Sequence, residues 1–148
     1  GDAEKIVLGA DFDAEFAAIA TAIGTKANSA DVAAGSSNLG YLNIPQNAQS
    51  GNYTLVLTDA GKHILHGSAD GSGDTYTIPA NSSVAFPLGT VVTFVNLASA
   101  TISIAITTDT LTLAGSTTTG TRTLGQNGIA TIIKVGTTSW LISGVGVA

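Results

Sequence analysis

Short segments of alternating apolar and polar residues, separated by turn-forming residues, fill the chain from about residue 41 onward. Thr101–Ile106 is the clearest of them, because Ile102, Ile104 and Ile106 fall on one face of an extended strand. Tyr53–Thr58 alternates in the same way. Clusters of Gly, Asn, Asp and Pro recur between such segments, as is typical of all-β domains. We therefore expect a mainly β head, built as an antiparallel sandwich or barrel-like sheet.

Two denser runs, Val91–Val95 and Ile129–Val135, are rich in β-branched residues. Such runs are typical of strands that are covered on both faces. The second run and Ser139–Ser143 flank a Gly-Thr-Thr turn, which predicts a hairpin. Trp140, the only tryptophan, alternates with Ile142 in that second strand, so we expect it in the core or in a subunit interface.

The beginning of the chain has a different pattern, in which the Ala-rich segment Asp11–Ala27 predicts a helix with Asp11 as its N-cap. The large apolar residues of the segment follow one another at intervals of four, three and four, as in the seam of a coiled coil: Phe12, Phe16, Ile19 and Ile23. A helix this short is marginal alone in water, so the seam needs a partner. That partner is either the β domain of the same chain or further copies of the helix.

The absence of a second predicted helix favours further copies, and β-branched residues at the seam favour assemblies larger than dimers. We therefore expect a homotrimer. Residues 28–40 are small and polar and are expected to form a linker. The chain is thus divided into a helical stem with its linker, residues 1–40, and a β head, residues 41–148.

Charge and composition exclude several classes of partner. Only 10% of the residues are charged, and the net charge is −5 with five basic residues, which argues against binding to nucleic acid. The longest charge-free stretch, Thr75–Thr108, contains proline, asparagine and many hydroxyl residues, so we expect no membrane insertion. Cysteine is absent, which excludes disulfides and thiolate chemistry. No motif indicates a cofactor, and we expect none.

Catalytic residues are not expected either. The β section contains no glutamate, and its only acidic residues are Asp59, Asp70, Asp74 and Asp109. A glycosidase needs two carboxyl groups facing each other across a cleft, and this spacing does not predict such a pair. Neither a nucleophile elbow nor a phosphate-binding loop is present. The chain is therefore expected not to be an enzyme.

Four residues are candidates for ligand contact. Asp70 and Asp74 lie in a Gly-rich turn with Tyr76 directly after it, which forms either a solvated turn or a loop that contacts sugar hydroxyls. The turn has a faint similarity to a calcium loop but lacks the third acidic residue and the closing glutamate. Arg122, the only arginine, is expected to bind an acidic sugar carboxylate or to form a surface pair with Asp109.

The two histidines, His63 and His66, are three residues apart. On a strand their side chains fall on opposite faces, whereas on a helical turn they could share a metal. We expect one histidine to be exposed and the other to be packed. We expect no metal site, because neither histidine has a third ligand beside it.

Taken in order, four segments resemble the C-terminal head region of tail-fibre proteins from tailed bacteriophages: Ala10–Ile23, Gly51–Leu65, Tyr76–Asn96 and Gly128–Gly144. The resemblance is strongest in Thr58–Ile64 and Ile78–Asn96. The resemblance implies an extracellular virion appendage that assembles as a homotrimer and binds a bacterial surface receptor, usually a capsule or lipopolysaccharide glycan. Two alternatives remain open. One is a tailspike-type polysaccharide depolymerase, and the other is a purely structural virion spacer or decoration domain.

Overall fold

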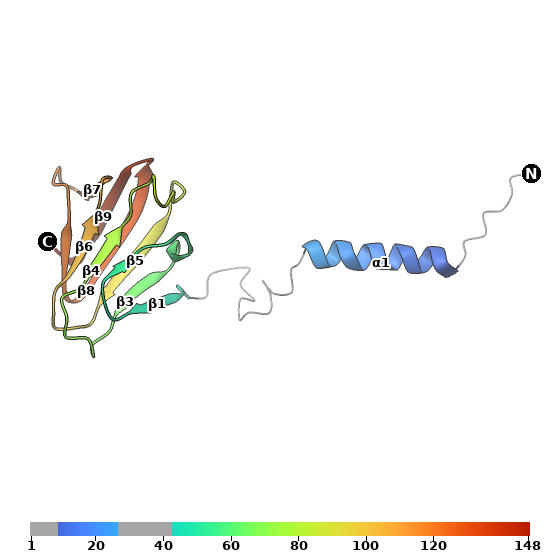
Figure 1. The fold of residues 1–148 in the computed structure, drawn as a ribbon, viewed down its shortest axis with the longest axis horizontal. Coiled ribbons are helices and arrows are strands. Elements are labelled where there is room, and N and C mark those ends of the chain that lie inside the picture. The colour runs from blue at the N-terminus through green and yellow to red at the C-terminus, as the bar shows by residue number, and fades with distance from the viewer. Residues whose placement is uncertain (1–8, 27–42) are drawn as a thin grey trace, which may run out of the picture. The chain divides into compact units, whose positions relative to one another are not determined.

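The computed structural model describes residues 9–26 and 43–148. Contacts within the chain divide it into two units, residues 1–43 and 44–148, and each unit is described by itself. The first contains the helix α1 (Gly9–Lys26), and the second is built of strands (Figure 1). The strands are β1 (Gln46–Gln49), β2 (Tyr53–Thr54), β3 (His63–His66), β4 (Thr75–Ile78), β5 (Val91–Asn96), β6 (Ile102–Ile106), β7 (Thr110–Leu113), β8 (Arg122–Gly136) and β9 (Ser139–Val147), with a short 3-10 helix η1 (Leu57–Asp59).

The predicted helix is confirmed as α1, whose alanine content explains its formation. It begins at Gly9, so Asp11 lies inside the helix and the prediction of Asp11 as the N-cap is wrong. Three seam residues, Phe12, Phe16 and Ile19, are exposed by half or more of their surface. The side chain of Ile23 lies outside the described part of the structure. Within the helical unit, these seam residues therefore remain exposed.

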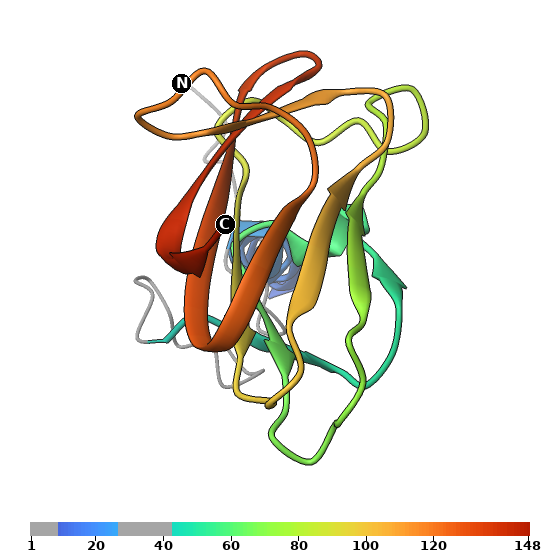
Figure 2. The ribbon, with the colours of Figure 1, turned by 90° about the vertical axis from the view of Figure 1, so that its left-hand side faces the viewer.

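The strands form one nearly closed, barrel-like sheet with the order β1-β3-β5-β8-β6-β4-β2 (Figure 2). β1, β3 and β5 pair in parallel, and so do β2, β4 and β6. The long strand β8 is antiparallel to both β5 and β6, so it joins the two parallel sets. β9 is antiparallel to β8 and parallel to β7. The sheet nearly closes between β1 and β2, which are consecutive in the chain.

The mainly β, barrel-like character is therefore confirmed, whereas the expectation of an antiparallel sheet is wrong for most strand pairs. Consecutive strands from β1 to β6 belong alternately to the two sets. Each time the chain returns to a set, the new strand therefore runs parallel to the previous strand of that set. The register partners Gln46, His63 and Thr93 are 17 and then 30 residues apart, which explains why the sequence shows no repeat. The predicted hairpin is confirmed as β8–β9.

Alternate side chains of the strands fill the interior of the head. Trp140 is 1% exposed and meets Phe86 edge to face at 5.6 Å between ring centroids, so its predicted place in the core is confirmed. The core consists of the following residues: Leu55, Ile64, Tyr76, Ile78, Phe86, Val92, Phe94, Ile102, Ile104, Leu111, Leu124, Ala130, Ile132, Trp140 and Ile142.

The outer face of β5, β8 and β9 is apolar and exposed. Pairing brings Val91 beside Ile133, and Ile129 beside Val145. All four are exposed large apolar residues, as is Val135. The sequence predicted cover on both faces of Val91–Val95 in β5 and Ile129–Val135 in β8, whereas several outward side chains of these strands are exposed in the head. We call these five residues the outer apolar face of the head.

Candidate functional site

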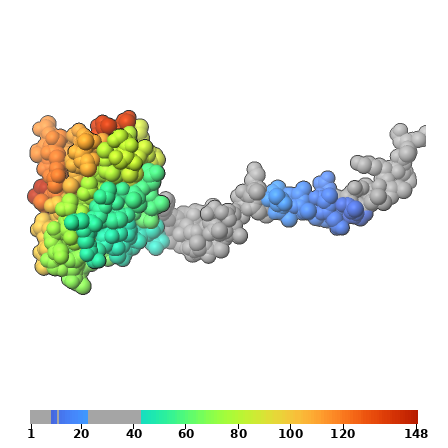
Figure 3. Space-filling model, in the orientation of Figure 1, coloured from blue at the N-terminus to red at the C-terminus, as the bar shows by residue number. Residues whose placement is uncertain are grey.

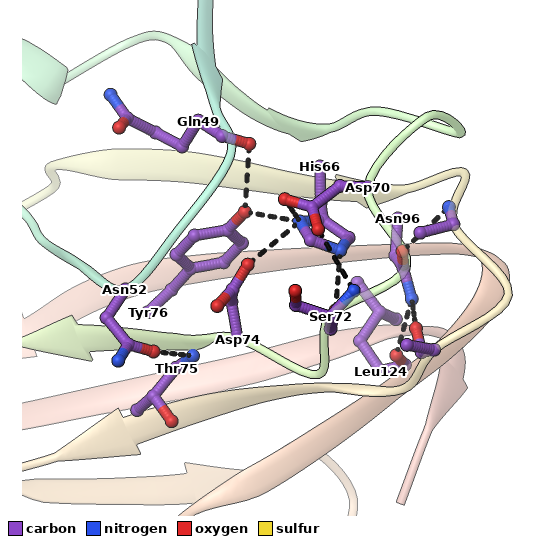
Figure 4. A network of polar contacts seen from close by, with 12 residues as sticks. Gln49, Asn52, His66, Asp70, Ser72, Asp74, Thr75, Tyr76, Asn96 and Leu124 are labelled. Atoms are coloured by element: carbon purple, nitrogen blue, oxygen red, sulfur yellow. Dashed lines mark hydrogen bonds and ion pairs between the residues drawn. The ribbon is translucent and has the colours of Figure 1, made fainter.

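The candidate site lies where β3 ends and β4 begins. His66, the last residue of β3, and Tyr76 in β4 both turn their side chains into the head, and both are 0% exposed. The connecting loop, residues 67–74, contains three glycines and returns over the imidazole (Figure 4). It places one carboxylate oxygen of Asp70 and one of Asp74 beside the same ring nitrogen of His66, Nδ1.

Both ring nitrogens of His66 face polar atoms. Nε2 lies 3.0 Å from the carbonyl oxygen of Ser72. A carbonyl oxygen can only accept, so Nε2 carries a proton. Nδ1 lies 2.9 Å from the hydroxyl of Tyr76 and 3.8 Å from Oδ2 of both Asp70 and Asp74. In the neutral ring, Nδ1 therefore accepts a hydrogen bond from Tyr76, and the two carboxyl groups lie beside it beyond hydrogen-bond distance.

The two carboxyl groups are only partly satisfied. Asp70 Oδ1 accepts the backbone N–H of Ser72 at 2.9 Å, and this bond lowers the pKa of Asp70 from its usual value. Oδ2 of Asp70 and Oδ2 of Asp74 are both buried, and neither has a hydrogen-bond partner among the described residues. Asp74 as a whole is 8% exposed. The loop thus holds two carboxylate oxygens without donors beside a buried imidazole.

Tyr76 connects the cluster to the core and to β1. Its ring stacks on Phe94 with 6.1 Å between centroids, and its hydroxyl also lies 3.4 Å from the carbonyl oxygen of Gln49. Burial raises the pKa of Tyr76 to about 12, and the charges of Asp74 and Asp70 act in the same direction. The hydroxyl therefore stays protonated at neutral pH and remains a donor.

A surface pocket of about 420 Å³ adjoins the cluster. Asp70 is one of its lining residues, together with Gln49 at the end of β1 and Ser50 directly after it, and Ala48 and Leu65 add an apolar part. β1 and β3 lie side by side, as the teal and green surfaces of Figure 3 show. Polar groups and a small apolar patch therefore share one concave surface.

The structure brings together three of the four predicted ligand residues, Asp70, Asp74 and Tyr76, although Tyr76 is in the core and not on a loop surface. Arg122 lies elsewhere and is 8% exposed, so its predicted surface pair with Asp109 is wrong. Asp109 instead accepts the backbone N–H of Asn81. Nε and Nη2 of Arg122 have no hydrogen-bond partner within the described ranges.

The two histidines behave as predicted, since His63 is half-buried on the outer side and His66 is buried. The ring of His63 contacts the carbonyl oxygen of Ile44 and the side chain of Gln46. What the sequence analysis missed is the role of His66 beside the two aspartates. The four-residue spacing of His66, Asp70 and Asp74 was the available sign, and a strand followed by a loop gives that spacing no fixed geometry.

Comparison with known proteins gives no match: no family model, no curated protein and no solved structure is significantly similar to the chain. Within residues 9–26 and 43–148, no helix is both long and apolar enough to span a membrane.

Proposed function

We propose that the chain is a receptor-binding fragment of a bacteriophage tail fibre, which binds a bacterial surface glycan by multivalent adhesion. The observation that carries the proposal is the pocket between β1 and the loop after β3. It combines the carboxylate of Asp70, the amide of Gln49 and the hydroxyl of Ser50 with the apolar Ala48 and Leu65. Sugars present hydroxyl groups and small apolar ring faces, and a pocket of this kind can accept both.

Assembly into a homotrimer is the second part of the proposal. The described chain leaves two apolar surfaces uncovered, the seam of α1 and the outer apolar face of the head. Exposed apolar patches of this kind mark interaction surfaces in soluble proteins. Further copies of the chain are the partner that we propose for both, because each copy brings the same two surfaces and closed symmetry buries them together.

Trimerisation would also explain how a shallow pocket supports adhesion. The pocket is small and open, so each site is expected to bind a glycan only weakly. Linking three such sites can raise the overall affinity by about 10²–10⁴ without any new contact. The proposed site residues from the sequence, Asp70, Asp74, Tyr76 and Arg122, would then contribute unequally, because only Asp70 lines the pocket.

The test is staining of bacteria by a fluorescent fusion of residues 1–148. We expect susceptible cells to be decorated and receptor-deficient mutants to remain dark. Ala48→Trp, which fills the pocket from the exposed side of β1, should remove staining without changing the oligomeric mass. Ser82→Trp is the matched control, since Ser82 is exposed in the turn after the other end of β4. Equal loss of staining in both variants would contradict the pocket assignment.

The same preparation separates the alternatives. Release of reducing ends from purified capsule or lipopolysaccharide would indicate a depolymerase. We expect none, because Asp70 and Asp74 both face His66 and do not face each other across an open cleft. A stable trimer that stains no strain would favour the structural spacer.

A further inference from the structure

Two unpartnered carboxylate oxygens set the cluster of His66, Asp70 and Asp74 apart from the other buried acids of the head. Asp59 accepts hydrogen bonds from Asn47, from the hydroxyl of Tyr53 and from a backbone N–H. Asp109 accepts a backbone N–H with both oxygens. Only Asp70 and Asp74 have a buried carboxylate oxygen with no hydrogen-bond partner among the described residues. A buried carboxylate without a donor is costly, and a cation bound beside the two oxygens would offset that cost.

In the neutral ring, Nδ1 of His66 makes its hydrogen bond with the hydroxyl of Tyr76 at 2.9 Å and with neither carboxylate. Both carboxylate oxygens are at 3.8 Å, which is beyond hydrogen-bond distance. An ion between Nδ1 and the two oxygens would instead contact all three, since these three donor atoms lie within 4.8 Å of one another.

We infer that Nδ1 of His66 and one carboxylate oxygen each of Asp70 and Asp74 bind a divalent transition-metal ion, with Zn²⁺ as the preferred ion. Two further contacts fit this role. Nε2 donates to the carbonyl of Ser72, which is the outer contact that metal-binding histidines ordinarily make and which leaves Nδ1 free to coordinate. The hydroxyl of Tyr76, displaced from Nδ1, has a second acceptor in the carbonyl of Gln49.

The donor set selects the ion. Imidazole nitrogen and carboxylate oxygen together suit Zn²⁺, whereas Ca²⁺ takes six to eight oxygen ligands, which this cluster does not offer. Tetrahedral zinc implies about 3.4 Å between donor atoms. Nδ1 lies 3.8 Å from each carboxylate oxygen, and all three donor atoms lie within 4.8 Å of one another, so the side chains have to move closer together to bind the ion. Three glycines in the loop, Gly67, Gly71 and Gly73, allow its backbone to adjust. Asp70 also lines the surface pocket, which gives the ion a path from solvent.

The consequence is a metal clamp between the end of β3 and the start of β4. These two strands belong to different parallel sets, so the ion would connect the two sets. It would hold the loop of residues 67–74 closed over the head. This inference is independent of adhesion, because the clamp uses residues of this chain whatever the pocket binds.

The experiment is calorimetric titration of the tag-free, chelator-treated chain with Zn²⁺, Mn²⁺ or Ca²⁺. We expect one Zn²⁺ per chain, weaker Mn²⁺ and no saturable Ca²⁺ binding. Zn²⁺ at about one hundred times its dissociation constant should raise the unfolding midpoint by about 10 °C. X-ray absorption at the zinc edge should show one imidazole among oxygen ligands.

Matched variants locate the site. His66→Gln and Asp74→Asn should weaken Zn²⁺ binding about a hundredfold or more, whereas His63→Gln and Asp109→Asn should not. Asp109 is as buried as Asp74, so the comparison controls for the loss of a buried charge. Asp70→Asn, whose side chain is nearer the surface, replaces Asp74→Asn if the latter does not fold. Absent Zn²⁺ binding, tighter binding of Ca²⁺, or Zn²⁺ binding that survives both site variants would overturn the proposal.

Discussion

The hydroxyl of Tyr76 gives the cluster a pH dependence of its own. The pKa of Tyr76 is raised to about 12 in the folded chain against 10.0 for a free tyrosine, so the folded state holds this proton more tightly than the unfolded state does. Folding stability from this group is therefore complete below pH 10 and is lost as the pH rises toward 12.

Tyr76→Phe keeps the ring but removes the titrating group. At neutral pH we expect the variant to be less stable by about 1 kcal/mol, because the hydrogen bond to His66 is lost. Between pH 10 and 12 the difference in stability between parent and variant should narrow, because only the parent chain has the hydroxyl of Tyr76, whose ionisation lowers its stability there. Urea unfolding with chelator present, followed by the fluorescence of the buried Trp140, measures both effects. A difference that stays constant through that range would contradict the assignment.

At the same scale, the sequence predicted which residues belong to the candidate site better than it predicted which residues surround them. Asp70, Asp74 and Tyr76 were singled out because they lie in and beside one turn, and they do lie together. His66 was set aside because strand geometry separates it from His63, which is correct but does not describe the loop that follows. The sequence predicts a surface pair of Arg122 with Asp109, but Arg122 lies on the inward face of β8 and is buried, although buried charges are rare.

Among the elements, the hairpin of β8 and β9 depends on a glycine that is not in a turn. A Cβ added to Gly144 would lie 2.0 Å from the carbonyl oxygen of Ile129 and 2.6 Å from Cα of Ala130. Both are backbone atoms of the paired strand, so a side-chain rotation cannot relieve the clash. Gly144→Ala should lower the free energy of unfolding by about 3 kcal/mol, as measured by urea denaturation.

Gly125→Ala in β8 is the matched control, because the nearest atom to its added Cβ is 3.9 Å away. We expect this variant to remain within about 0.5 kcal/mol of the parent. If the two variants were equally stable, the close approach of β9 to β8 at Gly144 would be wrong.

The longer strands β5, β6, β8 and β9 were predictable, whereas their partners were not. The predicted strand Tyr53–Thr58 is wrong beyond Thr54, because Leu57–Asp59 forms the 3-10 helix η1. A period of two identifies a strand and its inward face, as Thr101–Ile106 shows. It carries no information on the direction of the neighbouring strand. The sequence predicted the pairing of two strands only where a short turn joins them, as between β8 and β9. The long connections from β1 to β6 leave the choice to packing of the whole sheet.

For the whole molecule, trimer formation is the central prediction. Light scattering should give about 44 kDa, three times the 14.7 kDa chain. Ile19→Asp should dissociate or strongly weaken the trimer, because it would bring three carboxylates together in an apolar seam. Ala14→Asp adds the same charge on the opposite face of α1 and should leave the mass unchanged. A monomeric parent chain at micromolar concentration would contradict the proposal.

The position of β8 in the sheet has a consequence for synthesis. It is the strand that joins the two parallel sets, yet it follows all of them in the chain. While the ribosome is still making residues 122–136, β5 and β6 each lack one of their two neighbours. The head therefore cannot close during most of its own translation, and its parallel strands depend on contacts between distant residues that form slowly. Nascent chains stalled before β8 should accordingly be digested by protease, and protection should appear only once the hairpin with β9 has emerged.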